Sequence, residues 1–543
     1  MSRSVPHPDL GPGLLERILA HADRTPEHAA VQDPTRALTY GGLRAEVEGV
    51  AAGLGEEGVE PGQRVALHLT NSVDFVVAAL ACTAIGAVFI PLAVTDPVRR
   101  LEIVLEDSAP SLVVTAGPGS ESGGGSTATP AALLPVRHRQ VALPALRRAA
   151  GGGAARAEPP WDRPIYAIYT SGTTSAPKGV LVNQGAFLAA LTHAIDACGF
   201  DADTRALSVS AVHFDGSFAT VFSTLVAGGS LVFVPRDALL FPRTFINVVE
   251  RERITHTGFS PTYLHLLLTD PRLSRLSASS LKMIAVGGEA CPGADVAALW
   301  QRVPQVAVFN RYGPTETTVT VTHHRVSAAD TALTIVPIGV PHPGVVFEIL
   351  DDDGRVIEGP NVVGELYIGG DQLMAGYLDA PALTAEVLRD DFVAGETLYR
   401  TGDLVFRNAA GQYCYVDRVD RVIKRSGVRI SLVELTHALR GVPGVTAATC
   451  STFEAGDGGN GIVGFVVLAD EVREAPAAGE PGADTTASAR RIDAALRQVL
   501  PVSMLPDRIE VVDHLPMTPA GKVDERSLLA VAGLSRSGGG PAE

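Results

Sequence analysis

The sequence predicts an α/β protein with several domains. Short apolar segments that are typical of buried strands alternate with helix-like segments along almost the whole chain. The strand-like segments include 64–69, 111–115, 231–235 and 282–286, and the helix-like segments include 14–22 and 298–303. The chain has 543 residues, of which 46% are hydrophobic, and this exceeds what one core usually holds. We therefore expect at least two domains, with strands buried largely in parallel sheets.

One apolar segment, residues 75–94, carries no charged side chain and is long enough to cross a membrane. Gly86 and Pro91 interrupt it, and its flanks do not follow the positive-inside pattern. It is more simply a buried helix followed by a buried strand. We therefore expect no membrane partner.

Charge and cysteine usage exclude further classes. The formal net charge is −16, whereas a protein whose main role is to bind nucleic acid needs a positive surface. The five cysteines form no CxxC pair, which argues against a disulfide framework and a zinc site. The first residues lack the apolar region of a signal peptide, so we expect a cytoplasmic protein.

Three stretches rich in small and polar residues have the composition of flexible loops. They are residues 117–130, 149–160 and 473–489.

A hydroxyl-rich loop is the strongest single chemical signal. It follows the apolar strand-like segment 164–169 and contains Thr170, Ser171, Gly172, Thr173, Thr174 and Lys178. Short hydroxyl donors on a loop that allows close approach, together with one cation, suit a polyphosphate. The GxxxxGK[ST] spacing of a P-loop is absent. A solvated Ser/Thr loop is the alternative for this segment alone.

Eight further motifs follow the order of one known family. Together with the hydroxyl-rich loop, they resemble the signatures of the adenylate-forming superfamily, which contains acyl-CoA synthetases, luciferases and the adenylation domains of nonribosomal peptide synthetases. The resemblance covers residues 14 to about 530. The motifs are LTYGGL (38–43), GAVFIPL (86–92), HFDGS (213–217), NRYGPTE (310–316), GELYIGG (364–370), YRTGDL (399–404), DRVDRVIK (417–424) and PMTPAGKVD (516–524).

The resemblance implies a fold with two domains and a separate role for each. A large N-terminal adenylate-forming domain of layered α/β subdomains would span residues 1–419 and bind ATP and the acid. A small mobile α+β lid domain would span residues 420–543, with Asp420 as the hinge and Lys522 as a catalytic residue. Rotation of such a lid would serve adenylation first and thioester formation second.

The resemblance also implies an ATP site with Mg²⁺. The hydroxyl-rich loop would cover the β- and γ-phosphates, Thr315 the α-phosphate, and Glu316 the magnesium ion. The other implied nucleotide contacts are Asn310 and Tyr312 to adenine, Asp403 to the ribose, Arg418, and Lys522 between the substrate carboxylate and the α-phosphate. Thr315, Glu316 and Lys522 would take part in catalysis. Asp403, which follows a glycine, could instead be an ordinary turn residue.

Asp215 points to the amino-acid branch of the superfamily. In that branch an aspartate at this position pairs with the α-ammonium of the substrate. A fatty or aryl acid has no ammonium, and a buried unpaired carboxylate would be costly. The alternative is that Asp215 caps a helix that begins near Ser217.

Nine residues, judged by their positions relative to these motifs, are implied to line the site that binds the acid substrate. Most are small or aliphatic, which favours a small neutral amino acid such as alanine. Arg311 could pair with a side-chain carboxylate, which makes an acidic amino acid the second candidate, or it could fold over and shrink the pocket. The set is Asp215, Gly216, Ala219, Gly258, Ile284, Val286, Arg311, Val319 and Thr320.

The thiol acceptor is predicted to be a discrete carrier protein. Only nineteen residues follow Asp524 and none forms a phosphopantetheine attachment motif, so we expect a stand-alone aminoacyl–carrier-protein ligase. Several positions depart from the family pattern, among them Gln184, where histidine is usual, and Asp417, where glycine is usual. Asp417-Arg418 also occurs in acyl-CoA-synthetase-like relatives, so an acyl- or aryl-CoA ligase is the alternative. A catalytically idle nucleotide-binding protein is disfavoured, because Lys178, Glu316, Asp403 and Lys522 are present.

Overall fold

A computed structural model gives the structure of the chain, which divides into two compact units. The first contains residues 1–332, 336–348 and 367–401, and the second contains 333–335, 349–366 and 402–543. The described residues are 11–117, 137–149, 158–170, 177–390, 392–393, 395–419, 423–425, 428–430, 432–454, 460–469, 483–498, 500, 505–518 and 523–535.

An eight-stranded sheet of the first unit carries four of the nine predicted acid-binding residues, Gly258, Ile284, Val286 and Arg311. Its six inner strands run parallel, and an antiparallel strand lies at each edge. In spatial order the strands are β14 (Thr322–Arg325), β13 (Ala307–Tyr312), β12 (Met283–Gly287), β11 (His256–Phe259), β9 (Arg205–Ser208), β10 (Ser230–Val232), β1 (Ala29–Gln32) and β2 (Ala37–Thr39).

A seven-stranded sheet of the same unit carries the hydroxyl-rich loop. Its strands β4, β3, β5 and β6 run parallel, and the antiparallel pairing of β7 with β8 forms a hairpin. In spatial order the strands are β17 (Gly376–Tyr377), β8 (Lys178–Asn183), β7 (Pro164–Thr170), β4 (Val88–Pro91), β3 (Arg64–His68), β5 (Leu112–Thr115) and β6 (Gln140–Ala142).

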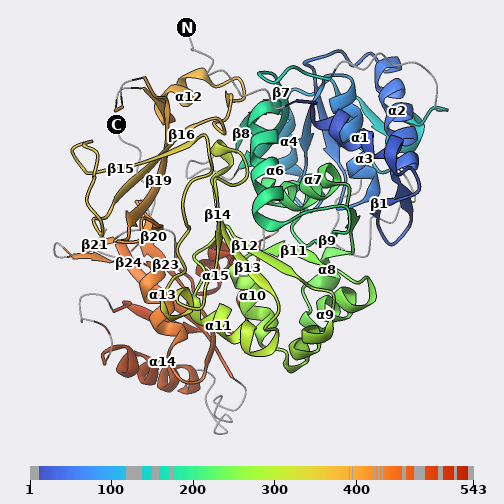
Figure 1. Ribbon diagram of the computed structural model, residues 1–543. Helices are drawn as coiled ribbons and strands as arrows, with labels where there is room; N and C mark the ends of the chain where they lie inside the picture. Colours follow the sequence, from blue (N-terminus) through green and yellow to red (C-terminus); the bar gives the residue numbers. More distant parts are fainter. Residues whose placement is uncertain are drawn as a thin grey trace. The chain divides into compact units, whose positions relative to one another are not determined.

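Helices α6 (Gln184–Cys198) and α7 (Phe218–Ala227) link these two sheets (Figure 1). They pack against each other, while α6 contacts β8 of one sheet and β14 of the other, and α7 contacts β9. Their apolar side chains join a core cluster with aromatic residues from the seven-stranded sheet. Phe218, for example, stacks edge-on against Tyr166 with ring centroids 5.1 Å apart. Sheet, helices and sheet therefore form the layers that the sequence predicts.

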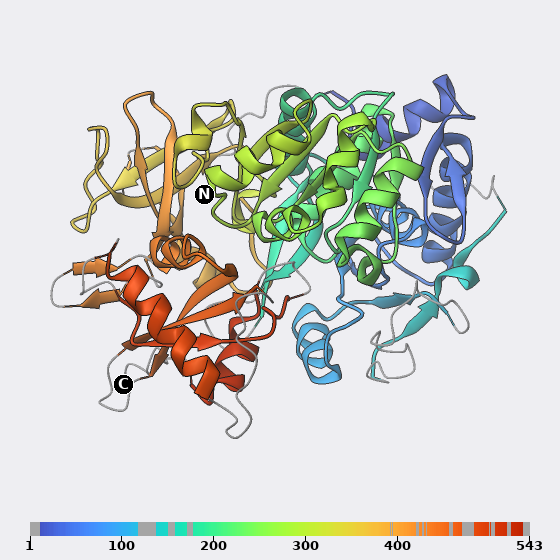
Figure 2. The ribbon, with the colours of Figure 1, turned by 90° about the horizontal axis from the view of Figure 1, so that it is seen from below.

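Of the remaining helices of the first unit, α1, α2 and α3 (blue in Figure 2) contribute to the same core cluster as α6 and α7. α9, α10 and α11 contribute to a second core cluster, on the other face of the eight-stranded sheet. The helices are α1 (Leu14–Arg24), α2 (Tyr40–Glu56), α3 (Val73–Ala84), α4 (Val98–Ser108), α5 (Leu143–Leu146), α8 (Arg236–Leu239), α9 (Pro242–Arg251), α10 (Pro261–Leu268), α11 (Gly293–Arg302) and α12 (Pro381–Val387), with 3₁₀ turns η2 (Asp215–Ser217), η3 (Pro271–Ala278), η4 (Thr315–Thr317) and η5 (Asp330–Ala332).

The uncharged segment 75–94 forms the buried helix and strand that its sequence predicts. α3 begins after Ser72, whose hydroxyl accepts a hydrogen bond from the Phe75 backbone N–H at 3.2 Å, and the chain then enters β4. Residues 75–92 are buried throughout. Among the described residues, no helix combines the length and apolar character needed to cross a membrane.

The strands of a third sheet contain residues from both units. It has the order β15 (Val345–Leu350), β16 (Gly364–Gly370), β19 (Leu398–Arg407), β18 (Leu388–Arg389), with β20 (Tyr413–Arg418) also paired to β19. Strands β15, β16 and β19 each begin in the residue range of one unit and end in that of the other.

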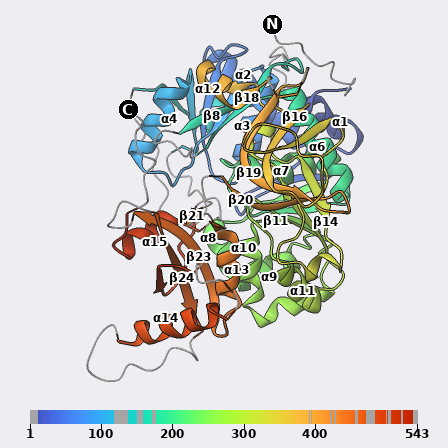
Figure 3. The same cartoon turned by 90° about the vertical axis from the view of Figure 1, so that its left-hand side faces the viewer.

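The second unit has a small α+β core (Figure 3). Its three-stranded sheet packs against α13 and α14 through an apolar cluster, and α15 contacts β23. The elements are β21 (Ile423–Arg425), β22 (Val428–Ile430), α13 (Leu432–Arg440), β23 (Val445–Glu454), β24 (Asn460–Leu468), α14 (Ala483–Leu496), β25 (Arg508–Val511) and α15 (Glu525–Val531).

The loop predictions have a mixed outcome. Most of 117–130 and 149–160 lies outside the described residues. The third predicted loop, 473–489, is wrong at its end, because α14 begins at Ala483. Its alanines and arginines favour a helix, and Ile492 and Leu496 on this helix are buried in the core of the second unit, which outweighs the weak local pattern.

Candidate active site

Asp215 opens the 3₁₀ turn η2, which leads directly into α7. The alternative that Asp215 is the N-cap residue is wrong, because the N-cap of η2 is Phe214 and that of α7 is Ser217. The carboxylate interacts electrostatically with two buried groups, Tyr166 and Arg311. Burial and then the Asp215 charge raise the pKa of the Tyr166 phenol well above its usual range, so Tyr166 is protonated at neutral pH. Asp215 itself is half-buried beside these two buried side chains.

Arg311 lies near the end of β13 and is 8% exposed. Its side chain crosses the neighbouring strand β12 at Gly287, where an added Cβ would lie 2.6 Å from Arg311 Cγ. It ends over β11, where a Cβ on Gly258 would lie 2.9 Å from Arg311 Nη2. The two glycines provide the room for this path. Burial lowers the pKa of Arg311, and the charges of Cys198 and Asp215 oppose that shift.

Strand periodicity divides the predicted acid-binding residues between two faces of the sheet. Gly258 is in register with Ala285, and Arg311 with Gly287, so these four share one face. Ile284 and Val286 alternate with Ala285 and Gly287, and both belong to the core cluster on the opposite face. The structure therefore does not bring them together with Arg311. Sequence position alone does not show which alternating set faces a pocket.

The loop after Glu316 has an unusual backbone. Thr318 and Val319 adopt φ angles of +59° and +67°, a left-handed conformation that is costly for β-branched residues. Gln372 holds this loop, because its Nε2 donates to the carbonyl of Thr318 at 3.3 Å and to that of Thr320 at 2.7 Å. This fixes Val319 and Thr320, both predicted to face the acid. No motif in the sequence singled out Gln372.

Three histidines lie beside this loop and beside Arg311. His323 is paired with Arg311 across the edge of the sheet, its Nδ1 lies 2.8 Å from His342 Nε2, and the His342 and His193 ring centroids are 4.7 Å apart. Burial lowers the pKa of His342 to about 4, and burial and then the charges of His342, Arg311 and His193 lower the pKa of His323 well below its usual range. Both rings are therefore neutral at neutral pH. No motif in the sequence indicates this group.

The predicted phosphate-binding residues of the first unit converge at the β7–β8 hairpin. Thr170 and Lys178 are register partners at its end, while Ser171, Gly172, Thr173 and Thr174 lie outside the described residues. Lys178 Nζ lies 5.5 Å from the centre of the Tyr377 ring. The Tyr377 hydroxyl donates a 2.8 Å hydrogen bond to Glu316 Oε1. Tyr377, which the sequence analysis missed, therefore links Lys178 to Glu316.

Asn310, Tyr312 and Thr315 lie on the same strand and the turn that follows it. Asn310 is buried, and its Nδ2 donates to the carbonyls of Val336 and Pro337 at 3.1 and 3.0 Å. Its amide nitrogen therefore anchors the backbone. Tyr312 is half-buried and packs edge-on against Phe347, and Thr315 begins η4.

In the second unit, Asp403 and Arg418 form an ion pair. They are register partners on β19 and β20, and Arg418 Nη1 lies 3.0 Å from Asp403 Oδ1. Gly402 has a φ of +72°, and an added Cβ would lie 3.0 Å from Arg418 Nη2. Asp403 thus belongs to a strand, and the turn alternative is wrong. Lys522 and Asp420 lie outside the described residues.

Two of the residues that depart from the family pattern, Asp417 and Gln184, have structural roles. Buried Asp417 accepts hydrogen bonds from the backbone N–H groups of Arg418 at 2.8 Å and Val433 at 3.4 Å, which ties β20 to the first turn of α13. Gln184 is buried; its Nε2 donates to the Pro159 carbonyl at 2.5 Å and its Oε1 accepts from the Leu14 N–H at 3.4 Å. Gln184 therefore connects α6 to two distant segments.

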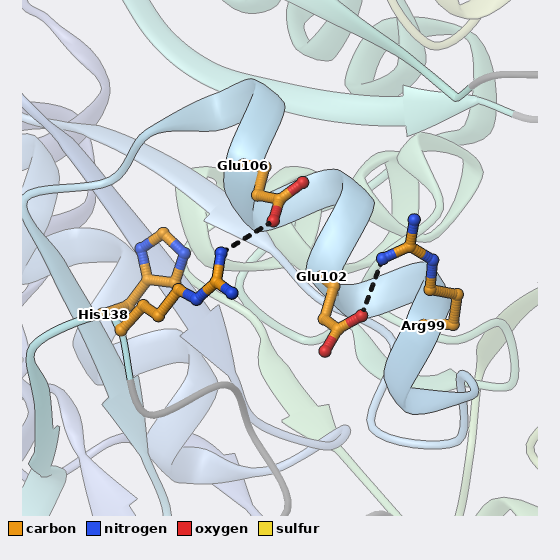
Figure 4. Close-up of a pocket in the computed structure, with 5 residues that line it drawn as sticks. Arg99, Glu102, Glu106 and His138 are labelled. Carbon is orange, nitrogen blue, oxygen red and sulfur yellow. Dashed lines mark hydrogen bonds and ion pairs between the residues drawn. The ribbon is translucent and has the colours of Figure 1, made fainter.

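A pocket beside α4 contains none of the predicted site residues (Figure 4). Its lining residues pair with each other: Arg99 with Glu102 at 3.0 Å and Arg137 with Glu106 at 3.7 Å. His138 completes the lining. Both arginines are largely exposed, so this is a solvated group of surface ion pairs.

The chain belongs to the family described as AMP-binding enzyme, whose sequence profile matches residues 18–378. This confirms the adenylate-forming superfamily that the motifs predict, with ATP use and an enzyme of the acid–thiol ligase class.

Two relatives illustrate how the chain compares in length. Novobiocin biosynthesis protein H of Streptomyces niveus is 33% identical over 507 residues, which cover 93% of this chain and 80% of that protein. The dimodular nonribosomal peptide synthase of Bacillus subtilis (strain 168) is 32% identical over 526 residues. There the match covers 95% of this chain but only 21% of the relative, so the chain spans a small part of that much longer protein.

Two solved structures support the same fold. The four-domain nonribosomal peptide synthetase AB3403, bound to AMP and glycine, matches 95% of this chain and 36% of its own, with a TM-score of 0.80 and 26% identity. IdnL1 matches 93% of this chain and all of its own, with a TM-score of 0.67 and 29% identity. The predicted fold class is therefore confirmed.

Proposed function

We propose that the chain activates an amino acid with ATP as an aminoacyl adenylate and transfers it to the phosphopantetheine thiol of a discrete carrier protein. The position of Asp215 carries this proposal. Its carboxylate is half-buried and interacts electrostatically with the buried side chains of Tyr166 and Arg311. An ammonium group is the natural partner for a carboxylate in such a place. The likeness to nonribosomal peptide synthetases, one of them bound to AMP and glycine, supports the same branch.

In this proposal the phosphates lie at the β7–β8 hairpin. Lys178 and the hydroxyl-rich loop bind the β- and γ-phosphates, and Thr315 binds the α-phosphate. Asp403 and Arg418 act on the ribose side, and Asn310 and Tyr312 on the adenine side. Lys522 stabilises the charge that develops between the substrate carboxylate and the α-phosphate. The lid domain from Asp420 onward carries Lys522.

The carboxylate of Glu316 fits a magnesium ion. Tyr377 donates to Oε1, which orients the carboxylate, and the described residues hold no group of three acidic or histidine side chains that would cage a metal. Mg²⁺ is commonly held by one or two carboxylates together with phosphate oxygens, so this donor set suits it. When bound, the ion would neutralise phosphate charge.

ATP–pyrophosphate exchange across the proteinogenic amino acids, several β-amino acids, and aryl and fatty acids tests the proposal. We expect exchange with one amino acid or a small group of them. The Lys522→Ala variant serves as the control for contaminating activity. Exchange only with acids that lack an amine would contradict the proposal and favour the acyl- or aryl-CoA ligase alternative.

A second assay identifies the thiol acceptor. With the activated acid known, loading of a holo carrier protein is compared with thioester formation on coenzyme A. The proposal predicts faster loading of the carrier protein. Faster turnover with coenzyme A would overturn the carrier-protein assignment while leaving the adenylation step in place.

A further inference from the structure

Arg311 is a buried cation to which the described part of the chain gives no anionic partner within ion-pair distance. It is more than nine-tenths buried, yet neither a hydrogen bond from its guanidinium nor a carboxylate within 4.0 Å is found among the described residues. Asp215 acts on it through its longer-range charge. A buried guanidinium without a partner is costly to the folded protein. A ligand that supplies the missing anion would remove this cost.

The neighbouring strands leave room for the long side chain of Arg311. Glycine stands at both positions that the side chain crosses, and a methyl group at Gly258 would lie only 2.9 Å from Arg311 Nη2. The guanidinium therefore ends over the face of β11 that also carries Ala285 and Gly287, away from the apolar core cluster of Ile284 and Val286. Its end lies on the face where the predicted acid-binding residue Gly258 is found.

The groups around the guanidinium do not supply a negative charge equal to its own. His323, its partner across the sheet edge, is neutral because its pKa is lowered well below the usual range. Burial raises the pKa of Cys198 to about 12, so this thiol is also neutral at pH 7. Asp215 carries a charge, but in the proposed function that charge is used by the substrate ammonium.

Two further buried polar atoms lack a hydrogen-bond partner among the described residues. They are the hydroxyls of Thr320, which is predicted to face the acid, and of Tyr166, which interacts with Asp215. Buried hydroxyls usually find a hydrogen-bond partner. A purely apolar side chain such as the methyl group of alanine would leave both hydroxyls and the guanidinium unsatisfied.

We infer that Arg311 is a specificity residue that binds a carboxylate on the substrate, and that the substrate class is an amino dicarboxylic acid. This rests on the proposed function. The acid that is activated is one carboxylate, Asp215 receives the ammonium, and the planar fork of Arg311 receives the second carboxylate. The guanidinium also occupies part of the space over Gly258, which favours a short side chain. The inference replaces alanine by an acidic amino acid as the first candidate.

Isothermal titration and pyrophosphate exchange test this with matched pairs: aspartate against asparagine, glutamate against glutamine, and alanine. We expect one acidic member to bind and exchange at least about 10²-fold better than its amide. The variant Arg311→Met keeps the length and apolar path but removes the charge, and it should abolish this preference. Arg311→Lys, which retains the charge without the fork, should keep part of it. Arg325→Met, at an exposed position of β14, is the control and should keep the preference.

The outcomes separate the inference from the proposed function. Efficient binding and exchange of alanine or an amide, unchanged by Arg311→Met, would overturn the inference but leave amino-acid activation intact. The wild-type protein could instead prefer a dicarboxylic acid without an amine and lose this preference in Arg311→Met. That result would support the role proposed for Arg311 but contradict the pairing of Asp215 with a substrate ammonium. Unchanged preference in Arg311→Met, or no binding of any acidic amino acid, overturns the inference. If Arg311→Met does not fold, as judged by thermal unfolding, Arg311→Lys gives the decisive comparison.

Discussion

Two arginines of the predicted substrate sites, Arg311 and Arg418, occupy opposite electrostatic situations. Both pass over a glycine, Arg311 over Gly287 and Arg418 over Gly402. Arg418 forms an ion pair with Asp403 at 3.0 Å, and its side chain is 37% exposed. Arg311 is 8% exposed, and the described residues supply no carboxylate within 4.0 Å of it. Arg418 thus has an ionic partner within the protein, whereas the partner that we propose for Arg311 is a ligand.

The difference shows how each site can be specific. The Arg418–Asp403 pair presents a fixed arrangement whose charges largely cancel, which suits the neutral hydroxyls of a ribose. The Arg311 region keeps an uncompensated charge out of water, and such a charge discriminates strongly between an anionic and a neutral ligand. In the proposed function, Arg311 would select the substrate by charge, whereas Asp403 and Arg418 would bind the ribose that every ATP molecule shares.

The largest expected effect comes from Asp215→Asn, which removes the negative charge that acts on Arg311. The KM for the preferred amino acid should rise about 10²- to 10³-fold, because a buried charge pair with the substrate ammonium is lost. The des-amino analogue should be activated as well as before. Steady-state pyrophosphate exchange with both acids measures the effect.

Asp203→Asn is the matched control, because Asp203 is exposed two residues before β9. It should leave both KM values unchanged. An equal loss for the amino acid and its des-amino analogue in Asp215→Asn would show that Asp215 supports the fold or the adenylation step rather than the ammonium.

Asp403→Asn should have a smaller effect, confined to the nucleotide. It breaks the ion pair with Arg418, and we expect the KM for ATP to rise about 10-fold while the KM for the amino acid stays the same. The comparison between the two arginines fails if the KM for the amino acid changes instead. Initial rates at varied ATP and at varied amino acid distinguish the two outcomes.

Much of this architecture follows from the sequence, because buried strands and amphipathic helices have distinct periods. The helix and strand within 75–94 were predicted correctly, and the motifs placed Thr170, Lys178 and Glu316 in one region. The face of β12 could not be predicted, because a one-residue shift exchanges Ile284 and Val286 for Ala285 and Gly287. The roles of Lys522 and of the domain boundary at residue 420 stay predictions.

The residues that the sequence analysis missed act through tertiary contacts. Gln372 contacts Thr318 and Thr320, more than fifty positions away along the chain, and Tyr377 contacts Glu316. Neither lies in a recognisable motif. The positive φ angles of Thr318 and Val319 run against the local preference of β-branched residues, so local sequence would not suggest them.

The histidines beside Arg311 predict a loss of stability in acid. In the folded state the pKa of His342 lies near 4, below its value of about 6.5 in the unfolded chain. The unfolded chain therefore binds the proton first, so stability is complete above pH 6.5 and falls as the pH drops towards 4. Each such histidine contributes about 1.4 kcal/mol per pH unit within that window.

His342→Gln should make the free energy of unfolding less dependent on pH by about one proton between pH 6 and 4.5. Glutamine can still bond to Gln372 and cannot take up a proton. Urea unfolding at several pH values measures the slope. A slope that does not change would mean that His342 is not the buried neutral group that the structure indicates.

The smallest expected effect is that of Tyr377→Phe, beside the predicted magnesium ligand Glu316 in the first unit. The change removes one hydroxyl, which donates to Glu316 Oε1 at 2.8 Å, and keeps the ring that lies 5.5 Å from Lys178 Nζ. Burial and the Glu316 charge raise the pKa of this phenol, so it is a donor throughout the neutral range. Loss of one hydrogen bond of about 1 kcal/mol predicts a several-fold rise in the magnesium concentration needed for half-maximal exchange. The preference among amino acids should not move, because Tyr377 touches the phosphate side alone. A change in that preference would mean that Glu316 and the acid-binding residues of the first unit are coupled through the loop that Gln372 holds, so that the substrate preference would not depend on Arg311 alone.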